Sequence, residues 1–429
     1  MKFFSTNKQA PKVGFQEAVM NSLPPDNGLY FPEHIPLLSE TVLRHFRQMS
    51  LPEIGYEMVK PFVGTAIESN ELKTIMEEVL SFEIPLIQVE ENIHSLELFH
   101  GPTYAFKDVG ARFLARCLGH FSQSKGKETT ILVATSGDTG GAVANGFLGI
   151  EGVSVIILYP SGKVSDLQEK QLTTLGGNIT ALEVNGDFDN CQALVKQAFL
   201  DKELNQKLNL TSANSINIAR WVPQSIYYAW LLTQLEQKIS PVIAVPSGNY
   251  GNVTAGMLAK KMGFPLGKFL ACSNANNIVP RYLATEKYEQ KPTVSTYANA
   301  MDVSLPSNFG RMQALYNNDY KAICNDVVGF SMSDQDILET IKLCQNQAGY
   351  LLDPHGAIGY KGLKTCLKAG GQGVFLETAH PIKFAPTMEK ALGYSLTIPT
   401  FAKELIDKEK VATKVEANFK AFKELLIDH

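Results

Sequence analysis

One lysine stands among apolar residues in the stretch Leu98-Phe-His-Gly-Pro-Thr-Tyr-Ala-Phe-Lys-Asp-Val-Gly110. This lysine, Lys107, precedes apolar residues at helical spacing, which predict a helix over residues 107–121. The helix dipole and desolvation by neighbouring apolar side chains both disfavour the ammonium form at the helix N-terminus. The neutral amine is the form that attacks an aldehyde to give a Schiff base. From these residues alone, an ordinary lysine at a helix start, with Asp108 as a surface neighbour, remains an alternative.

Two glycine turns of similar construction follow further along the chain. They are Ser136-Gly-Asp-Thr-Gly-Gly141 and Ser247-Gly-Asn-Tyr-Gly-Asn252, and each comes after an apolar run and opens a helical pattern. Free backbone N–H groups at a helix start bind anions, and glycine lets the backbone approach a ligand closely. Either turn alone is equally compatible with a packing turn between a strand and a helix. Together with Lys107, the two turns favour two anions near one aldehyde: a cofactor phosphate and a substrate anion.

Apolar runs alternate with helical patterns from about residue 85 to 270. Strands are expected at 130–135, 153–159, 179–184 and 241–246, and a further one at 373–378. Helices are expected at 141–148, 189–199, 251–262 and 334–348, the last with Ser333 as its N-cap. Continuous apolar strands between helices indicate a parallel sheet covered on both faces, so the predicted class is α/β.

The two ends of the chain differ from this middle part. Residues 15–23 and 51–59 have amphipathic helical patterns, broken by prolines between them, and we expect a separate N-terminal domain over 1–85. The tail from about 399 to 429 is charged and carries apolar residues at helical spacing, namely Phe419, Phe422, Leu425 and Leu426. It is expected to be a solvated helix that packs one face on the body.

Composition excludes several classes of protein. The 429 residues suggest two or three domains, and 45% hydrophobic residues are enough for a large core. With 39 basic and 43 acidic residues the formal charge is −4, which gives no overall attraction to nucleic acid or to an anionic membrane. The start of the chain lacks the apolar run of a signal peptide, and no run reaches the ~18 residues of a membrane span. Six scattered cysteines fit reduced thiols, so we expect a cytoplasmic protein.

The common motifs of other enzyme classes are also missing from the sequence. The glycine turns do not follow G-x-G-x-x-G, which disfavours a dinucleotide enzyme. There is no G-x-x-x-x-G-K-[ST] phosphate loop, no H-E-x-x-H zinc motif and no G-x-S-x-G nucleophile turn. No metal site is therefore expected.

The lysine stretch resembles the pyridoxal-phosphate lysine segment of threonine synthases, of the bacterial and fungal type. Other segments match that family in the same order, so that the resemblance covers nearly the whole chain; they are Asn27-Gly-Leu-Tyr-Phe-Pro32, Ala134-Thr-Ser-Gly-Asp-Thr-Gly140, Ser212-Ala-Asn-Ser-Ile-Asn-Ile-Ala-Arg220, Pro246-Ser-Gly-Asn-Tyr-Gly-Asn252, Asn299-Ala-Met-Asp-Val303, Asp353-Pro-His-Gly-Ala357 and Glu377-Thr-Ala-His-Pro381.

The resemblance implies a tryptophan-synthase-β-like fold, the fold type II of pyridoxal-phosphate enzymes. It would have two open, parallel-type sheets covered by helices and a mostly helical N-terminal domain. The implied division is an N-terminal domain over 1–85, a large cofactor-binding domain over 86–123 and 211–429, and a small mobile domain over 124–210.

The resemblance also implies roles for individual residues. Lys107 would bind pyridoxal 5'-phosphate covalently and act as the catalytic base, and the hydroxyl of Thr378 would meet the pyridine nitrogen. The cofactor phosphate would be held by Ser247, Gly248, Asn249, Tyr250, Gly251 and Asn252. The substrate carboxylate would be held by Ser136, Gly137, Thr139 and Gly140. Asp138 lies in the same turn, but an aspartate beside the cofactor's phenolate would repel it unless protonated or hydrogen-bonded, so its role is open.

A substrate phosphate needs positive charge, and the best candidates are Lys163 and Arg220, because arginine offers a fork that matches phosphate oxygens. Asn217 could add a neutral donor. The reaction implied is the conversion of O-phospho-L-homoserine and water to L-threonine and phosphate. Neither His355 nor His380 is given a role.

Two alternatives share parts of this pattern. A serine/threonine dehydratase or a cysteine-synthase-like enzyme would have Lys107 and both turns, but would not need two cations for a substrate phosphate. A non-catalytic paralogue could bind a phosphorylated metabolite, although the retained lysine argues against it. Tyr104 departs from the smaller residue expected in many family members. The oligomeric state, a monomer or a small homo-oligomer, is left open.

Overall fold

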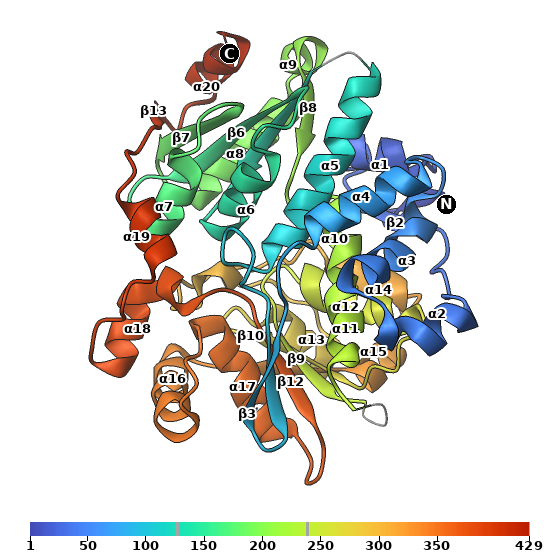
Figure 1. Cartoon of the computed structure of the whole chain (residues 1–429). Coiled ribbons are helices and arrows are strands. Elements are labelled where there is room, and N and C mark those ends of the chain that lie inside the picture. Colours follow the sequence, from blue (N-terminus) through green and yellow to red (C-terminus); the bar gives the residue numbers. More distant parts are fainter. Residues whose placement is uncertain (126–127, 237–239, 429) are drawn as a thin grey trace.

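The computed structural model describes residues 1–125, 128–236 and 240–428 and contains two open sheets with helices around them (Figure 1). In Figure 1 the smaller sheet lies above the larger one, and the N-terminal elements lie beside both. The predicted α/β class is confirmed, and so is the architecture of two open, mostly parallel sheets that the family resemblance implied.

The larger sheet has the strand order β11-β10-β9-β12-β4-β3. All neighbours pair in parallel except β3 and β4, which form an antiparallel pair at one edge. The bounds are β3 Leu86–Glu90, β4 Ile93–Glu97, β9 Val242–Pro246, β10 Phe269–Ser273, β11 Val327–Ser331 and β12 Gly373–Glu377. Strands β9, β10 and β12 are buried almost throughout, as expected of parallel strands covered on both faces.

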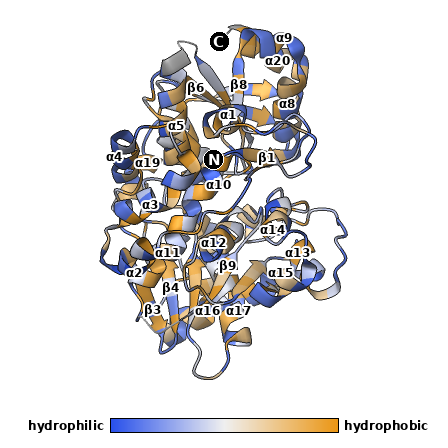
Figure 2. Cartoon of the chain, turned by 90° about the vertical axis from the view of Figure 1, so that its right-hand side faces the viewer, coloured by the Kyte–Doolittle hydropathy of each residue, from blue (hydrophilic) through white to orange (hydrophobic). Residues whose placement is uncertain are grey.

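The smaller sheet is parallel throughout, with the order β13-β7-β6-β5-β8. Its strands are β5 Thr129–Ala134, β6 Val153–Pro160, β7 Ile179–Asn185, β8 Asn209–Ser212 and β13 Thr413–Glu416. Coloured by hydropathy, the helix α20 (Phe419–Asp428) outside this sheet carries both hydrophobic and hydrophilic residues (Figure 2).

The helices predicted from periodicity form close to their expected bounds. They are α5 Lys107–Lys125, α6 Asp138–Phe147, α8 Phe188–Leu200, α12 Gly251–Lys261 and α16 Asp334–Ala348, and Ser333 caps the last as predicted. The remaining helices of the body are α7 Asp166–Thr173, α9 Lys202–Lys207, α10 Ile218–Trp221, α11 Ile226–Thr233, α13 Ile278–Thr285, α14 Phe309–Leu315, α15 Tyr320–Asp326 and α17 Pro354–Cys366. Short 3-10 turns are η1 Phe46–Gln48, η2 Val222–Ser225, η3 Asn299–Met301 and η4 Pro381–Phe384.

The N-terminal region contains both predicted helices, and two more. They are α1 Phe15–Asn21, α2 Glu40–His45, α3 Leu51–Val63 and α4 Ser69–Val79. The capping box of Ser50 and Glu53 begins α3. The region also has a small antiparallel sheet, β1 Phe3–Ser5 with β2 Tyr30–Pro32, which the sequence analysis did not predict. Three-residue strands are too short to give a recognisable alternation.

The C-terminal segment returns from the larger sheet to the smaller one. After α18 (Ala385–Leu392), α19 (Thr400–Ile406) packs against α7, β13 pairs with β7, and α20 packs on α8. The predicted amphipathic helix is confirmed, because Phe422 and Leu426 are buried. His429, the last residue of the predicted tail, lies outside the described residues. The division into domains, with its small mobile part, stays a prediction.

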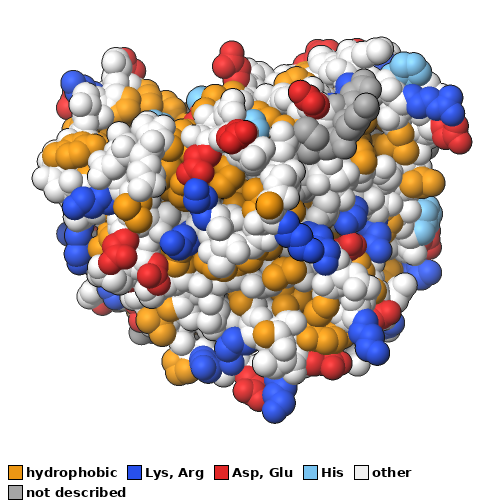
Figure 3. Space-filling view, turned by 90° about the horizontal axis from the view of Figure 1, so that it is seen from below, with side chains coloured by type: hydrophobic (Ala, Val, Ile, Leu, Met, Phe, Trp, Pro, Cys, Tyr) orange, Lys and Arg blue, Asp and Glu red, His pale blue; other side chains and the backbone are white. Residues whose placement is uncertain are grey.

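Among the residues that the structure describes, no helix combines the length and the apolar character that crossing a bilayer requires. The face seen in Figure 3 mixes acidic and basic side chains, without one continuous basic area.

Candidate active site

Three loops predicted to carry chemistry leave the carboxyl ends of adjacent strands of the larger sheet. Strand β4 leads to the Lys107 stretch, β12 ends immediately before Thr378, and β9 ends immediately before Ser247. Because β12 pairs in parallel with both β4 and β9, these three strand ends lie at one edge of the sheet. Ligands of open α/β sheets bind outside such carboxyl ends.

Backbone hydrogen bonds tie the Lys107 stretch to the Thr378 segment. The N–H of Phe106 donates to the carbonyl of Thr378 at 2.9 Å, and the N–H of His380 donates to the carbonyl of Tyr104 at 3.0 Å. These two hydrogen bonds hold the residue before Lys107 against Thr378, and α5 begins at Lys107 itself. The side chain of Thr378 is buried. The structure thus brings these two predicted cofactor residues together.

The surroundings of Lys107 favour its neutral amine. Desolvation lowers the pKa of this half-buried lysine to about 8; Lys383 and Arg220 lower it further, and Asp138 opposes them. Its Nζ also lies 5.8 Å from the centre of the Phe106 ring. A lysine with a pKa near neutrality has a usable fraction of nucleophilic amine, as the sequence analysis expected.

The turn between β9 and α12 is a sharp one that leads directly into a helix start. Tyr250 has left-handed backbone geometry, with φ of 61°, and α12 begins at the next residue, Gly251. The N–H groups of a first helical turn have no partner within the helix. A Cβ on Gly248 would lie 2.6 Å from the Cα of Met301, so this position has no room for any side chain. A narrow, glycine-lined turn at the start of a helix is a type of site that binds phosphate groups, and its binding of the cofactor phosphate stays a prediction.

The polar side chains of the same turn hold its shape. Asn249 donates from Nδ2 to Ser215 at 2.5 Å and accepts from the N–H of Ser307 at 2.5 Å. Asn252 accepts from the hydroxyl of Ser247 at 2.7 Å. These side chains therefore hold the shape of the turn, and the predicted contact of the turn with a cofactor phosphate stays a prediction.

The second glycine turn links β5 to α6 and is held from within. Thr135 accepts hydrogen bonds at Oγ1 from the N–H groups of Gly137, at 3.0 Å, and Gly140, at 2.8 Å. Gly137 has a φ of 138°, and a Cβ there would lie 2.5 Å from the side chain of Gln168. Ser136 is exposed and Thr139 half-buried at this turn. Their predicted contact with a substrate carboxylate stays a prediction.

A buried lysine that the sequence analysis missed accompanies Asp138. The Nζ of Lys383 lies 2.8 Å from Oδ1 of Asp138 and donates to the carbonyl of Thr103 at 2.9 Å. Gln168 donates to the same carboxylate oxygen at 3.0 Å. Burial by itself would raise the pKa of Asp138, but Lys383 and Lys107 outweigh it and hold that pKa well below its usual range. The carboxylate is therefore hydrogen-bonded by two side chains, which is one of the two conditions under which an aspartate can lie near a phenolate.

A signal for Lys383 was present in the sequence. It stands between Ile382 and Phe384, directly after the Glu377-Thr-Ala-His-Pro381 segment. Lysine is almost never fully buried unless it is paired. A lysine enclosed by apolar residues beside a family motif can therefore be taken as a site candidate.

The two predicted phosphate cations have different surroundings. Arg220 is buried, and its Nη1 donates to the carbonyl of Ala213 at 2.6 Å. Burial lowers the pKa of Arg220 to about 10. A Cβ on Gly110 would lie 3.2 Å from its Nε, which places the guanidinium against the first turn of α5. Lys163 is exposed between β6 and α7, without an ion pair to any residue of the described ranges. Only Arg220 is therefore brought to Lys107.

Asn217 has a structural role in α10. It donates to the carbonyl of Val19 at 2.9 Å and accepts from the N–H of Ala219 at 3.0 Å, capping the helix. Its predicted contact with substrate stays untested.

Three residues left without a role can now be placed. Tyr104 has a φ of 58° and stacks on Phe401 of α19, with ring centres 3.7 Å apart. Burial lowers the pKa of His380 to about 4, and its Nδ1 accepts from the N–H of Ile382. Nδ1 of His355 lies 2.9 Å from Oδ1 of Asp353, the residue that caps the start of α17. All three therefore make packing or capping contacts.

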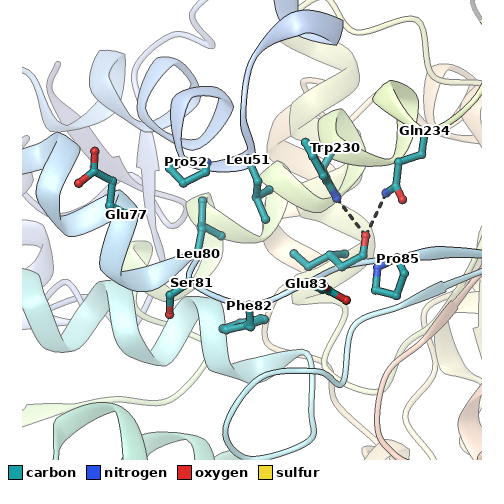
Figure 4. Close-up of a pocket in the computed structure, with 11 residues that line it drawn as sticks. Leu51, Pro52, Glu77, Leu80, Ser81, Phe82, Glu83, Pro85, Trp230 and Gln234 are labelled. Atoms are coloured by element: carbon teal, nitrogen blue, oxygen red, sulfur yellow. Dashed lines mark hydrogen bonds between the residues drawn. The ribbon is translucent and has the colours of Figure 1, made fainter.

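A surface groove lies apart from these loops (Figure 4). Trp230 and Gln234 both donate there to the carbonyl of Ile84 at 2.9 Å, which joins α11 to the connection before β3. None of the predicted site residues lines this groove, so the predicted chemistry belongs to the strand ends.

Family models match the chain along almost its whole length. A model described as threonine synthase N terminus matches residues 2–80, one described as pyridoxal-phosphate dependent enzyme matches 85–376, and one described as threonine synthase, C-terminal matches 356–426. The threonine synthase of Haemophilus influenzae is 46% identical over 410 residues, which are 95% of this chain and 94% of that one.

Solved structures agree with these matches. The crystal structure of threonine synthase from Escherichia coli has a TM-score of 0.93 and 40% identity, with 100% of both chains covered. The structure of pyridoxal-phosphate-bound threonine synthase from Brucella melitensis has a TM-score of 0.94 and 33% identity, covering 100% of this chain and 99% of that one. The chain therefore belongs to the threonine synthase family of pyridoxal-phosphate-dependent enzymes.

Proposed function

We propose that the chain converts O-phospho-L-homoserine and water to L-threonine and phosphate, with Lys107 as the base that moves the substrate's protons. The observation that carries this proposal is the arrangement at one sheet edge. A lysine with a lowered pKa, a buried threonine hydroxyl and a glycine-lined helix start follow three adjacent strands.

The residues present fit pyridoxal phosphate. Lys107 would hold its aldehyde carbon, Thr378 would meet its ring nitrogen, and the turn from Ser247 to Asn252 would hold its phosphate. When bound, the cofactor supplies an electron sink that lets protons leave the substrate carbons next to it.

Lys107 would take the proton from Cα and the proton from Cβ, and it would return a proton later. Because its pKa is about 8, it can both accept and release a proton near neutral pH. A hydroxyl partner such as Thr378 adds no negative charge at the ring nitrogen, unlike a carboxylate.

The substrate's two anionic ends need separate partners. The turn of Ser136, Gly137, Thr139 and Gly140 would bind its carboxylate, with Asp138 held beside it by Lys383. Arg220 is the favoured partner for its phosphate, since it lies against the first turn of the Lys107 helix. Lys163 would have to approach from the loop between β6 and α7.

Water must add at Cβ only after phosphate has left Cγ. We infer that the part of the chain over 124–210 moves to exclude water earlier in the reaction. We also infer a cytoplasmic enzyme that acts as a monomer or small homo-oligomer on a small-molecule substrate.

The direct test is to incubate the protein with O-phosphohomoserine and to measure phosphate and threonine together. Equal release of both is expected, with no turnover in Lys107→Ala and normal turnover in Lys361→Ala, an exposed lysine of α17. Phosphate with a 2-oxo acid would instead indicate elimination without addition of water at Cβ. Absence of both products would overturn the proposal.

A further inference from the structure

The side chain of Asn308 is buried with its orientation fixed. It immediately precedes α14 and is fully buried. Its Oδ1 accepts a hydrogen bond from Nη1 of Arg311 at 2.7 Å. Arginine offers only donors, so the atom facing it must be the amide oxygen and the Nδ2 group must face the other way.

Arg311 cannot easily turn away from this contact. Its guanidinium is buried and donates to the carbonyls of Tyr30, at 3.2 Å, and Ile216, at 2.6 Å. Its Cζ also lies 4.7 Å from the centre of the Trp221 ring. The amide of Asn308 is therefore held in one orientation by contacts that reach the N-terminal region.

The free end of this amide lies beside the first residue of α12. Nδ2 of Asn308 is buried and has no hydrogen-bond partner among the residues that the structure describes. It is the atom nearest to a Cβ built on Gly251, the first residue of α12, at 3.3 Å. The backbone N–H of Asn308 also donates to the carbonyl of Asn249 in the same turn, at 3.3 Å.

A buried donor without an acceptor is costly, and native proteins rarely keep one. The start of α12 also favours an anion, because the first backbone N–H groups of a helix lack partners and the helix dipole is positive at that end. A phosphate oxygen bound there would accept a hydrogen bond from Nδ2. The buried donor would then be paired, and the helix start would face an anion.

We propose that Asn308 donates a hydrogen bond from Nδ2 to the cofactor phosphate held at the start of α12. This inference rests on the proposed cofactor site and adds to it a residue that lies 56 positions beyond the end of the turn in the sequence, from Asn252 to Asn308. It makes binding of the phosphate depend on the segment that α14 begins.

Two substitutions separate this role from a structural one. Asn308→Ala removes the donor. Asn308→Asp keeps an oxygen that accepts a hydrogen bond from Arg311, and so keeps the contact that orients this side chain, but it replaces the Nδ2 donor with a negatively charged oxygen. Asn346→Ala, at an exposed position of α16, is the matched control.

Each protein is purified as holoenzyme, freed of cofactor and titrated with pyridoxal phosphate and with pyridoxal, which lacks the phosphate. A hydrogen bond to a charged group predicts that Asn308→Ala weakens pyridoxal phosphate by about 10- to 100-fold. Asn308→Asp is expected to weaken the binding of pyridoxal phosphate more than Asn308→Ala does, because its negative charge would face the phosphate. The affinity for pyridoxal is expected to be unchanged in both, and the ³¹P resonance of the bound cofactor is expected to shift.

Wild-type affinity for pyridoxal phosphate in both variants would overturn the inference, as would an equal loss for the two ligands. If Asn308→Ala does not fold, Asn308→Asp decides the question by the same comparison. A wild-type protein that binds no cofactor would contradict the proposed function itself. A wild-type protein that makes threonine while the Asn308 variants bind normally would contradict only this inference.

Discussion

Replacing Lys383 with methionine removes the cation that pairs with Asp138 inside the site. The two charged atoms are 2.8 Å apart, and the side chains are 0% and 5% exposed. At an effective dielectric constant of about 20, unit charges at this separation attract by about 6 kcal/mol. Desolvation of both groups offsets part of this, and removing one partner of a buried pair costs about 3–5 kcal/mol. We therefore expect Lys383→Met to lower the free energy of unfolding by several kcal/mol.

A double-mutant cycle isolates the pair from the loss of packing. The proteins are wild type, Lys383→Met, Asp138→Asn and the double variant, and the assay is urea unfolding of the cofactor-free protein at pH 7.5. The double variant should be more stable than the sum of the single effects predicts, by about 2 kcal/mol or more, because it leaves no unpaired buried charge. Lys361→Met on the surface is the control for loss of a lysine.

The pH dependence has a defined sign. In the wild type the pKa of Asp138 is lowered on folding, so its contribution is complete above the unfolded pKa of about 3.9 and is lost only as the pH falls through the folded pKa. In Lys383→Met the pKa of Asp138 is still raised by burial but no longer lowered by Lys383, so Asp138 of the folded variant takes up a proton at a higher pH than in the wild type. The stability deficit should be largest at neutral pH and shrink on acidification. Additive single effects, or a deficit that grows on acidification, would refute the reasoning.

Further predictions concern Lys107 and the Gly248 turn. The pKa of Lys107 is lowered to about 8 from its usual 10.5, so its charged form destabilises the folded protein at pH 7, and Lys107→Met should stabilise the cofactor-free protein there. The difference in stability between variant and wild type should narrow as the pH rises above 8, because the buried lysine then loses its charge. Thermal unfolding across this pH range checks this, and a difference in stability that does not change with pH would contradict it. Gly248→Ala would place a Cβ 2.6 Å from the Cα of Met301, and overpacking of about 1–3 kcal/mol predicts roughly tenfold weaker cofactor binding. Gly14→Ala, where a Cβ meets nothing within 4 Å, is the control and should bind cofactor like the wild type. If an absorbance titration gave Gly248→Ala and Gly14→Ala the same affinity for the cofactor, the role of the Gly248 turn in cofactor binding would be contradicted.

The sequence was informative about the elements and about the chemistry of the Lys107 stretch. Apolar runs such as the one that forms β6 predicted buried strands, since parallel strands covered on both faces need apolar residues at every position. The same periodicity placed the start of α5 at Lys107, and with it a lysine with a lowered pKa.

The arrangement of those elements was not predictable from local pattern. Strands β4, β9 and β12 are neighbours although more than a hundred residues separate each from the next in the chain. Pairing of this kind depends on crossovers that no local periodicity records. β13 was missed for another reason, because an edge strand with a mostly exposed, polar sequence has no apolar signal.

Individual partners were the hardest to predict. Lys383 pairs with Asp138 across more than two hundred residues, and Asn308 is oriented by Arg311, whose own contacts lie near Tyr30 and Ile216. Arg220 and Lys163 were equal candidates from sequence, and only folding distinguishes the buried arginine from the exposed lysine. These distinctions depend on tertiary burial, which sets the electrostatics of each group.

The central claim is that the substrate's carbon–oxygen bond breaks and that water then adds at Cβ. Turnover of O-phosphohomoserine in ¹⁸O-labelled water, followed by mass spectrometry of both products, tests it most directly. The account predicts one labelled oxygen in threonine, at its hydroxyl group, and unlabelled phosphate, because the bridging oxygen leaves with the phosphate. Label in the phosphate, with homoserine as the other product, would mean hydrolysis at phosphorus and would contradict the account.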